Sequence, residues 1–590
     1  MKQLKFDILI IAGVLALLVS GCSSSKQTTV SKPMSETPEK GNFQKGQTWS
    51  PGDMEFSEKF IEAVRQEEKG DNQSAINLLT ECLTIKPTDA ATSYELAKIY
   101  LSLKKYDVAL NYSSILPKKD PNNQWYLQQY TDILAASNKF KEAAAAYADY
   151  IKHNPDNIDR YFDYAYYLTK AQEYDEAIKA YNQIETQTGI NEDVSQEKER
   201  LYLKMGKVDK AIDEANKLIA NNPGEPSYYA MLADLYSANK MDDKAMDALQ
   251  KLLQIDPNNP QAELALSEYY YKKGDNDQAF DNLKKAFESP ELELDKKIQI
   301  LYPYLNSMIV DPKQRSRALI LGRILVTTNP SSARSYATFG DILSQAYAFD
   351  SALIEYKKSI SYDSSKFSVW QQILLIDSRN GRTDSLLNDS KHALSLFPDQ
   401  ILVYYFNGIA NMQKKQYQTA INVFGKGLKI GSDNKQILGD MYADEGDAFN
   451  IMKQYHASDS AYEMALIFEP DNSTVLNNYA YYLSLRSENL DKAEKMSKHS
   501  NELSPNNAAF EDTYAWVLYK EKKYADAKVW SEKSMSHGGS SDAENLDHYG
   551  NILYQLGDVD GAVKYWKMAK DLHLDSAVID KKITDRKLYE

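Results

Sequence analysis

The chain has 590 residues, a formal net charge of −15, and 24 glycines against 43 tyrosines. One compact core is excluded because single cores stop growing at about 250–300 residues, and the low glycine count argues against a β-rich chain. An acidic chain without a basic block is also a poor candidate for binding nucleic acid, since Lys and Arg supply most of the affinity for phosphates.

The N-terminus has a basic start and then an apolar run from Ile8 to Val19. This order is typical of a secretory signal peptide, and the run is too short to span a bilayer. The residues Val19-Ser20-Gly21-Cys22 resemble the lipobox of bacterial lipoproteins. The resemblance implies that residues 1–21 are removed and that Cys22 is acylated. A cleaved signal peptide with an incidental cysteine is the alternative.

Serine rather than aspartate follows Cys22, and an acidic cluster just downstream is absent. By resemblance to lipoprotein sorting signals, this favours the outer membrane, with the body of the protein facing the periplasm. Residues 22–54 are rich in Ser, Thr, Pro, Gly and Lys and show no helical periodicity, which predicts a flexible tether. With Cys22 acylated, Cys82 has no partner for a disulfide, and we expect a buried structural thiol there.

Residues 226–259 have the pattern of one helix, a turn, a second helix and a stop at Pro257. Neither helix can bury its apolar stripe alone. The unit recurs with a period of 34, and the prolines that end the units keep nearly the same register. The period is carried by one small residue in seven successive units: Ala75, Ala109, Ala143, Ala177, Ala211, Ala245 and Ala279.

A period of 34 with two helices per unit resembles the tetratricopeptide repeat (TPR) family. The resemblance covers about residues 55–576 and implies an all-α fold, a right-handed superhelical solenoid of about fifteen repeats. Two insertions, near Pro290 and near Ser432, divide the array. We predict an N-terminal array over 55–292, a middle array over 299–434, a C-terminal array over 439–576, and a capping helix over 577–590.

Leu386 and Ser458 replace the small alanine in units ten and twelve, and we expect these two units to pack differently. Five glycines fall in the turns between helices, where a left-handed conformation is cheap for glycine. They are Gly70, Gly206, Gly274, Gly381 and Gly557.

In TPR proteins the first helix of each unit lines the concave wall and holds the ligand. Aspartates and aromatic rings on such a wall would hold an extended peptide by hydrogen bonds and stacking, with a bias toward Lys or Arg. A solvated helix face is the alternative. Transferring the family register gives a predicted inner wall of Asp132, Tyr166, Asp234, Asp341, Tyr405, Asp447, Tyr481 and Trp516.

The sequence offers no recognisable reaction centre. The seven histidines do not form a zinc-protease helix, and no glycine-rich nucleotide loop joins a strand to a helix. His548 is the only histidine in the middle of a first helix. Because repeats fill the chain, we expect no enzyme activity, no cofactor and no metal.

We therefore predict a lipid-anchored scaffold that binds other envelope proteins or their peptide segments. Secretion, outer-membrane biogenesis and cell-wall regulation are the candidate assemblies. A carbohydrate- or peptidoglycan-binding lipoprotein is the main alternative, because starch-utilisation lipoproteins also contain TPR helices. A hydrolase, or a subunit that carries its cofactor, is a third class.

Overall fold

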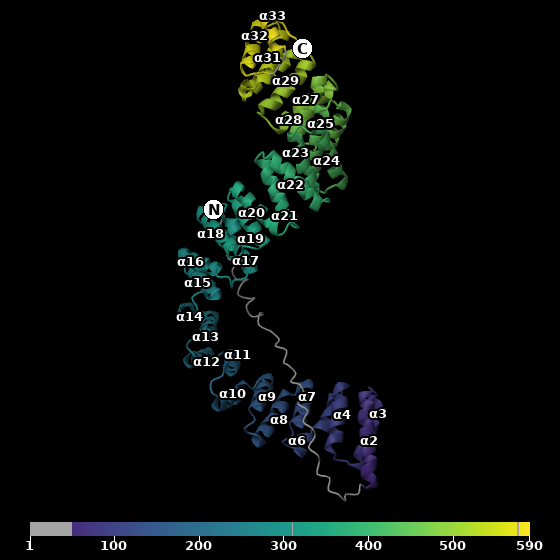
Figure 1. Cartoon of the computed structure of the whole chain (residues 1–590), viewed down its shortest axis with the longest axis vertical. Helices are drawn as coiled ribbons and strands as arrows, with labels where there is room; N and C mark the ends of the chain where they lie inside the picture. Colours follow the sequence, from purple (N-terminus) through teal and green to yellow (C-terminus); the bar gives the residue numbers. More distant parts are fainter. Residues whose placement is uncertain (1–49, 310, 575–577, 590) are drawn as a thin grey trace. The chain divides into compact units, whose positions relative to one another are not determined.

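The computed structural model describes residues 50–309, 311–574 and 578–589 (Figure 1). The predicted signal peptide, Cys22 and nearly all of the predicted tether lie outside the described residues. Helix α2 begins at Pro51, whereas the predicted tether extends to residue 54. Among the described residues, every regular element is helical. Within the same residues, no helix combines the length and the apolar character needed to cross a membrane.

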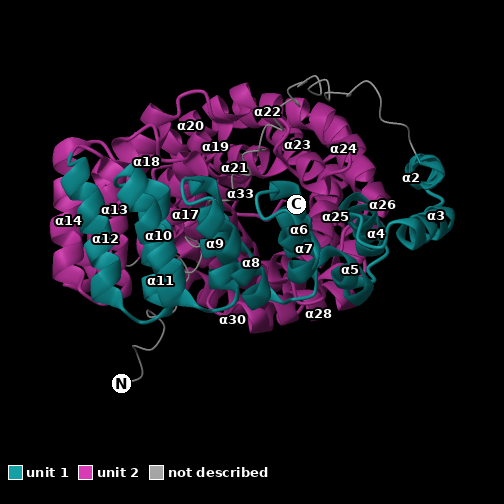
Figure 2. Ribbon diagram, turned by 90° about the horizontal axis from the view of Figure 1, so that it is seen from below, with its two compact units in different colours: residues 1–223 teal, residues 224–590 magenta. Residues whose placement is uncertain are grey.

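The described residues form fifteen consecutive helical hairpins, followed by one short helix. The predicted all-α hairpin array is confirmed; the right hand of its superhelix stays a prediction. The structure divides into two compact units between Pro223 and Gly224, which Figure 2 colours separately. The predicted division into three arrays is not tested by this partition and also stays a prediction.

Unit 1, which ends at Pro223, contains the first five hairpins. In the second hairpin, the second helix is interrupted: it consists of α5 and of α6, which is a single turn. The helices are α2 Pro51–Glu68, α3 Asn72–Ile85, α4 Ala90–Ser102, α5 Tyr106–Ser113, α6 Leu116–Lys119, α7 Gln124–Ala136, α8 Phe140–His153, α9 Ile158–Lys170, α10 Tyr174–Thr188, α11 Glu192–Lys204 and α12 Val208–Asn221.

Unit 2, which begins at Gly224, contains the other ten hairpins and the last helix. Its first half comprises α13 Pro226–Ala238, α14 Asp242–Ile255, α15 Pro260–Lys272, α16 Asn276–Glu288, α17 Leu294–Ser307, α18 Pro312–Thr328, α19 Ala333–Gln345, α20 Phe349–Tyr362, α21 Phe367–Arg379 and α22 Thr383–Leu396. Its second half comprises α23 Ile401–Gln413, α24 Tyr417–Ile430, α25 Lys435–Ile451, α26 Tyr455–Phe468, α27 Ser473–Arg486, α28 Leu490–Leu503, α29 Ala508–Lys520, α30 Tyr524–Ser536, the 3₁₀ turn η1 Gly539–Ser541, α31 Ala543–Gln555, α32 Val559–Asp571 and α33 Ile579–Asp585.

A left-handed residue in the turn lets the second helix fold back on the first. All five glycines predicted in the turns have positive φ, between +64° and +88°. In other turns a residue with a side chain takes the same conformation at some cost in strain, as Lys240 does with φ of +59°. Short polar side chains start many of the helices, because they accept hydrogen bonds from the free backbone N–H groups of the first turn. Asn507, for example, accepts from the N–H groups of Ala509 and Phe510 at the start of α29.

The repeated alanine is buried in each unit where the period predicts it, so that paired helix backbones approach closely. Ala75 and Ala211 are fully buried, and Ala245 is 6% exposed. Ser458, which replaces alanine in unit twelve, is fully buried and donates its hydroxyl to the carbonyl of Gly446 at 2.8 Å. Leu386 is fully buried in unit ten. Cys82 is a free, buried thiol, as predicted.

The two insertions alter single hairpins. The first precedes α17, which carries Pro303 within the helix. The second precedes α25, which begins at Lys435 and runs for 17 residues. The short α33 packs against α32 at the end of the array, and it buries Ile579 and Lys582. A cap was predicted from the polar character of this segment, but a buried lysine in it was not.

Candidate functional site

The predicted inner-wall residues differ widely in exposure. Tyr166 is 51% exposed, whereas Trp516 is 6% exposed. Asp132, Asp234 and Asp341 are exposed; Tyr405, Asp447 and Tyr481 are half-buried. The eight residues therefore do not form one uniform surface, and each stretch has to be considered separately.

The exposed aspartates make few contacts. The Gln128 amide donates to Asp132 at 2.9 Å, and the Tyr356 hydroxyl donates to Asp341 at 2.7 Å. In unit 1, the ring of Tyr166 meets Tyr167 edge-on. These residues remain open to a partner, but none of them is held by groups from several hairpins.

Helix α25 carries a stripe of three aspartates at i, i+4 and i+7, which places them on one helix face. They are Asp440, Asp444 and Asp447, and all three are half-buried. Burial, and then the negative charges of Asp447 and Asp440, raise the pKa of Asp444 to about 7. In the described part of the chain, none of the three is paired with a cation. We call these residues the α25 acidic stripe.

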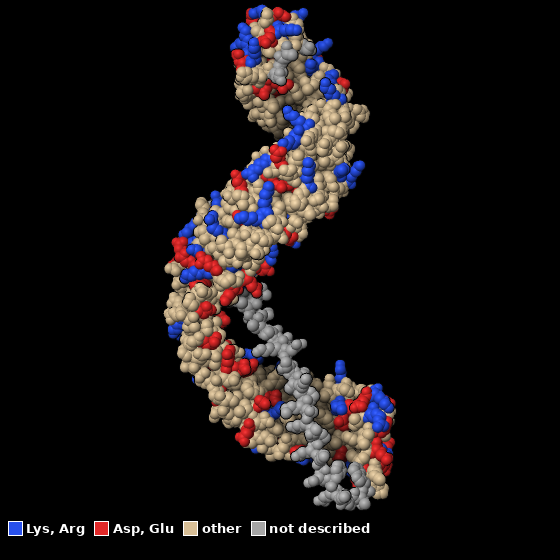
Figure 3. All heavy atoms as spheres, viewed as in Figure 1, with Lys and Arg blue, Asp and Glu red and all other residues tan. Residues whose placement is uncertain are grey.

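Tyrosines from neighbouring helices surround the α25 acidic stripe. Tyr482 of α27 donates to Asp447 at 2.9 Å, and Tyr462 of α26 donates to the same oxygen. Burial, followed by the charges of Asp444 and Asp440, raises the pKa of Tyr405 on α23 above its ordinary value. The stripe is thus a negatively charged, aromatic-lined surface supported by three hairpins. By contrast, acidic and basic side chains are interspersed over the face drawn in Figure 3.

In the last three hairpins, side chains that can form hydrogen bonds occupy the fifth and ninth positions of the first helices, α27, α29 and α31. The fifth positions hold Asn477, Asp512 and Asp547, and the ninth hold Tyr481, Trp516 and Asn551. Counting from the helix starts makes these two columns equivalent from one hairpin to the next.

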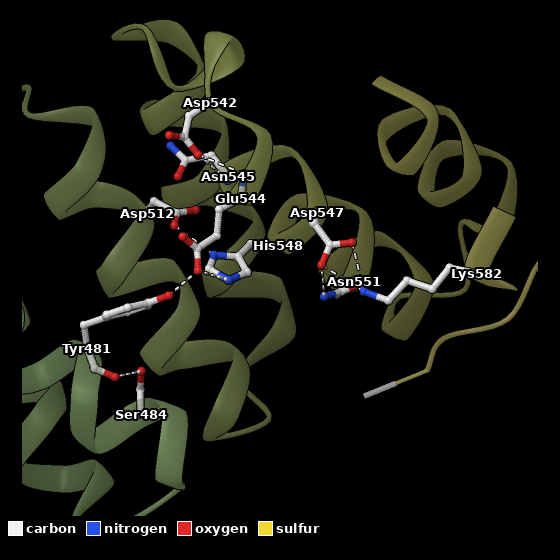
Figure 4. A network of polar contacts seen from close by, with 10 residues as sticks. All are labelled: Tyr481, Ser484, Asp512, Asp542, Glu544, Asn545, Asp547, His548, Asn551 and Lys582. Atoms are coloured by element: carbon white, nitrogen blue, oxygen red, sulfur yellow. Dashed lines mark hydrogen bonds and ion pairs between the residues drawn. The ribbon is translucent and has the colours of Figure 1, made fainter. Parts of the chain in front are cut away.

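A histidine of α31 binds the acid of the preceding hairpin (Figure 4). The Nδ1 atom of His548 lies 2.8 Å from a carboxylate oxygen of Asp512, and its ring stacks on Trp516 with centroids 3.8 Å apart. Burial lowers the pKa of His548, but the charge of Asp512 and its hydrogen bond outweigh this effect. The pKa of His548 therefore lies above its ordinary value, which favours the charged imidazolium.

The same arrangement recurs one step along the array. Lys582 of α33 donates to both oxygens of Asp547, at 2.9 and 2.8 Å, and to the side-chain oxygen of Asn551 at 3.0 Å. The ammonium also lies 5.7 Å from the centre of the Trp566 ring. Each fifth-position aspartate thus receives a basic group from the helix that follows in the stack.

Sequence analysis missed Asp440, Asp444, Asp512 and Lys582 as site residues. The signal for Asp512 was available, because Asp512 and Asp547 hold equivalent positions in successive units. A signal for Asp440 and Asp444 was also available, because they lie seven and three residues before the predicted Asp447 and so share its helix face. Among the described residues, no group of three or more His, Cys, Asp or Glu could hold a metal ion.

Comparison with known proteins identifies the repeats. Two family models, both described as tetratricopeptide repeat, match residues 67–129 and residues 132–189 and 200–260. A TPR repeat-containing protein of Pseudomonas aeruginosa is 26% identical over 158 residues. The chain contains tetratricopeptide repeats. The match to the Pseudomonas protein covers 26% of this chain and 26% of that protein, so the chain spans about a quarter of its length.

Two solved structures are similar to this chain. A Naa15/Naa10 complex bound to HypK is 13% identical, with 91% of this TPR chain and 90% of that chain covered and a TM-score of 0.34. A tetratricopeptide repeat protein from Parabacteroides merdae is 18% identical, with 42% of this chain and 98% of that chain covered and a TM-score of 0.25. At these TM-scores, neither likeness shows how the hairpins of this TPR protein are arranged.

Proposed function

We propose that the protein is a non-catalytic scaffold for protein–protein interaction, and that the α25 acidic stripe binds a cationic, extended segment of a partner. Tetratricopeptide repeats are interaction modules, and this chain consists of little else among its described residues. The observation that carries the proposal is the unpaired charge of the stripe.

The energetics of the α25 acidic stripe favour a cationic ligand. Three carboxylates on one helix face repel one another, and partial burial strengthens that repulsion because the local dielectric constant is lower than that of water. The raised pKa of Asp444 is a sign of this cost. A Lys or Arg side chain would remove the repulsion on binding.

Peptide selection would test this function. We expect full-length protein to select twelve-residue peptides rich in Lys and Arg from a random display library. The double change Asp440→Asn and Asp444→Asn should weaken binding of the selected peptides at least about tenfold, with affinity falling as salt rises. Asp433→Asn is the matched control, because Asp433 is an exposed acid just before α25. Equal losses in the control, or no cationic enrichment, would refute the proposal.

We further propose that the scaffold is lipid-anchored through Cys22 and faces the periplasm from the outer membrane, where it would bind other envelope proteins. The lipobox resemblance and the tether composition support this location. The Cys22→Ser variant should lose both membrane fractionation and incorporation of a labelled fatty acid. Membrane association that persists in this variant without acylation would contradict the anchor.

A further inference from the structure

One side-chain contact spans three successive hairpins in unit 2. Tyr481 of α27 donates its hydroxyl to Glu544 at the start of α31, and the acid Asp512 on the intervening helix α29 lies beside this bond (Figure 4). We call this contact the Tyr481–Glu544 bridge. Asp512, Trp516 and His548 are only 5%, 6% and 5% exposed, although they belong to helices of the predicted inner wall. The Glu544 side chain itself is 57% exposed.

The residues beside the bridge have unused hydrogen-bonding capacity. One carboxylate oxygen of Asp512 binds His548, and the other is buried without a partner among the described residues. The indole N–H of Trp516 is likewise buried and unpartnered. A buried polar atom without a partner costs about 1–3 kcal/mol, so such atoms are rare in proteins unless they have a further role. The free Asp512 oxygen can accept a hydrogen bond from a ligand.

The equivalent place in the next hairpin shows which chemistry fits. There, Asp547 and Asn551 hold an ammonium group, that of Lys582. Asp512 and Trp516 occupy the same two helix positions as Asp547 and Asn551. The fifth-position carboxylate is therefore already seen to bind lysine within this chain. At Asp512 on α29, His548 binds one carboxylate oxygen and leaves the other free.

We propose that the free oxygen of Asp512 and the carboxylate of Glu544 form a closed site for the lysine ammonium of a partner protein, with Tyr481 as its lid. The incoming ammonium donates to Asp512 and to Glu544, and the Tyr481 hydroxyl leaves Glu544 for water. His548 keeps its bond to the other oxygen of Asp512. This site is separate from the α25 acidic stripe and uses none of its residues.

A binding titration separates the lid from general charge attraction. The probe is a fluorescein-labelled tetralysine peptide, followed by anisotropy with the full-length protein. Tyr481→Phe leaves the net charge unchanged and removes only the hydroxyl that donates a hydrogen bond to Glu544. We expect this variant to bind the probe about 3–10-fold more tightly, because the ligand no longer has to break the bridge. An unchanged or weaker affinity would overturn the proposal.

Three further arms complete the test. Asp512→Asn should weaken binding about tenfold, because it removes a charge-assisted hydrogen bond. Asp526→Asn removes the same charge from an exposed position on α30 and should change the affinity by less than about twofold. The same peptide with acetylated lysines should not bind. Equal losses in Asp512→Asn and Asp526→Asn, or binding of the acetylated peptide, would refute the ammonium site.

The α25 acidic stripe also attracts cations, so the titration is repeated in an Asp440→Asn, Asp444→Asn background. If the effect of Tyr481→Phe persists there, the lysine site stands whether or not the stripe binds peptides. Loss of the Tyr481→Phe effect in that background would mean that the probe binds at the stripe alone, and the proposal would fail. Should Asp512→Asn unfold its hairpin, the Tyr481→Phe result still decides.

Discussion

Tyr166 and Trp516 hold the same position, the ninth residue of the first helix, in two hairpins of this array. Tyr166 on α9 is 51% exposed, and it contacts Tyr167 and the ammonium of Lys170 in the same helix. Trp516 on α29 is 6% exposed and is stacked against His548 of the next hairpin. One repeat position is thus open in unit 1 and closed near the end of unit 2.

The difference arises from contacts between hairpins rather than from the residues themselves. A tyrosine and a tryptophan are both suited to an exposed ligand-binding wall. On α29, however, the fifth-position Asp512 recruits His548, and Tyr481 reaches Glu544 beside them. On α9 the fifth position is Phe162, which has no carboxylate to form an ion pair with a basic group. The fifth residue therefore decides whether the ninth stays available.

The largest expected effect comes from truncating the two ninth residues. Trp516→Ala should destabilise its region by about 3–5 kcal/mol, because it opens a cavity beneath a stacked ring. Tyr166→Ala should change stability by no more than about 0.5 kcal/mol, as is usual for an exposed site. Amide hydrogen exchange, measured helix by helix, would show faster exchange in α29 and α31 for the first variant only. Similar effects in the two variants would break the comparison.

The second expected effect is a pH dependence confined to the closed region. Because the pKa of His548 is raised in the folded protein, its pairing with Asp512 adds stability that is fully present below the unfolded pKa. That stability is lost as pH rises through the folded pKa. Protection of α29 and α31 against exchange, corrected for the intrinsic rate, should therefore fall as pH rises above the ordinary histidine pKa of about 6.5, by up to about 1.5–3 kcal/mol.

The His548→Gln variant is the control for this pH effect, since glutamine can donate to Asp512 without titrating. We expect a flat profile in α29 and α31 for this variant. Asp444 also loses stability as pH rises, because burial raises its pKa from 3.8 to about 7, but it does so below pH 7 and lies on α25. A slope that survives in α29 and α31 of His548→Gln would assign the effect to another group.

Local patterns in the sequence predicted the hairpins well. The period of 34 located the buried alanines, such as Ala211, because a small residue is needed wherever two helix backbones cross. The glycine turns were predicted correctly for a similar reason, as Gly70 shows with φ of +83°. These features depend on residues within one hairpin, whose spacing along the chain fixes their contacts.

Contacts between hairpins could not be predicted in the same way. The bond from Tyr481 to Glu544 joins residues 63 positions apart, and its formation depends on how three hairpins stack. Lys582 lies in the predicted capping helix, and it is buried because Asp547 offers it a carboxylate. The α25 acidic stripe also escaped prediction, since its exposure and lack of cations depend on the surrounding helices.

The smallest expected effect compares one polar contact from each region. Tyr481→Phe removes a hydrogen bond between hairpins to a charged acceptor, and we expect it to lower the protection of α31 by about 0.5–1.5 kcal/mol. Asp132→Ala removes an exposed contact with Gln128 within one helix, for which about 0.2–0.5 kcal/mol is typical. Exchange of the α31 amides in the first variant and of the α7 amides in the second gives both numbers. If Asp132→Ala cost as much as Tyr481→Phe, the bridge would contribute no more than an ordinary surface contact, and the closure of the C-terminal hairpins would rest on the stacking of Trp516 and His548 alone.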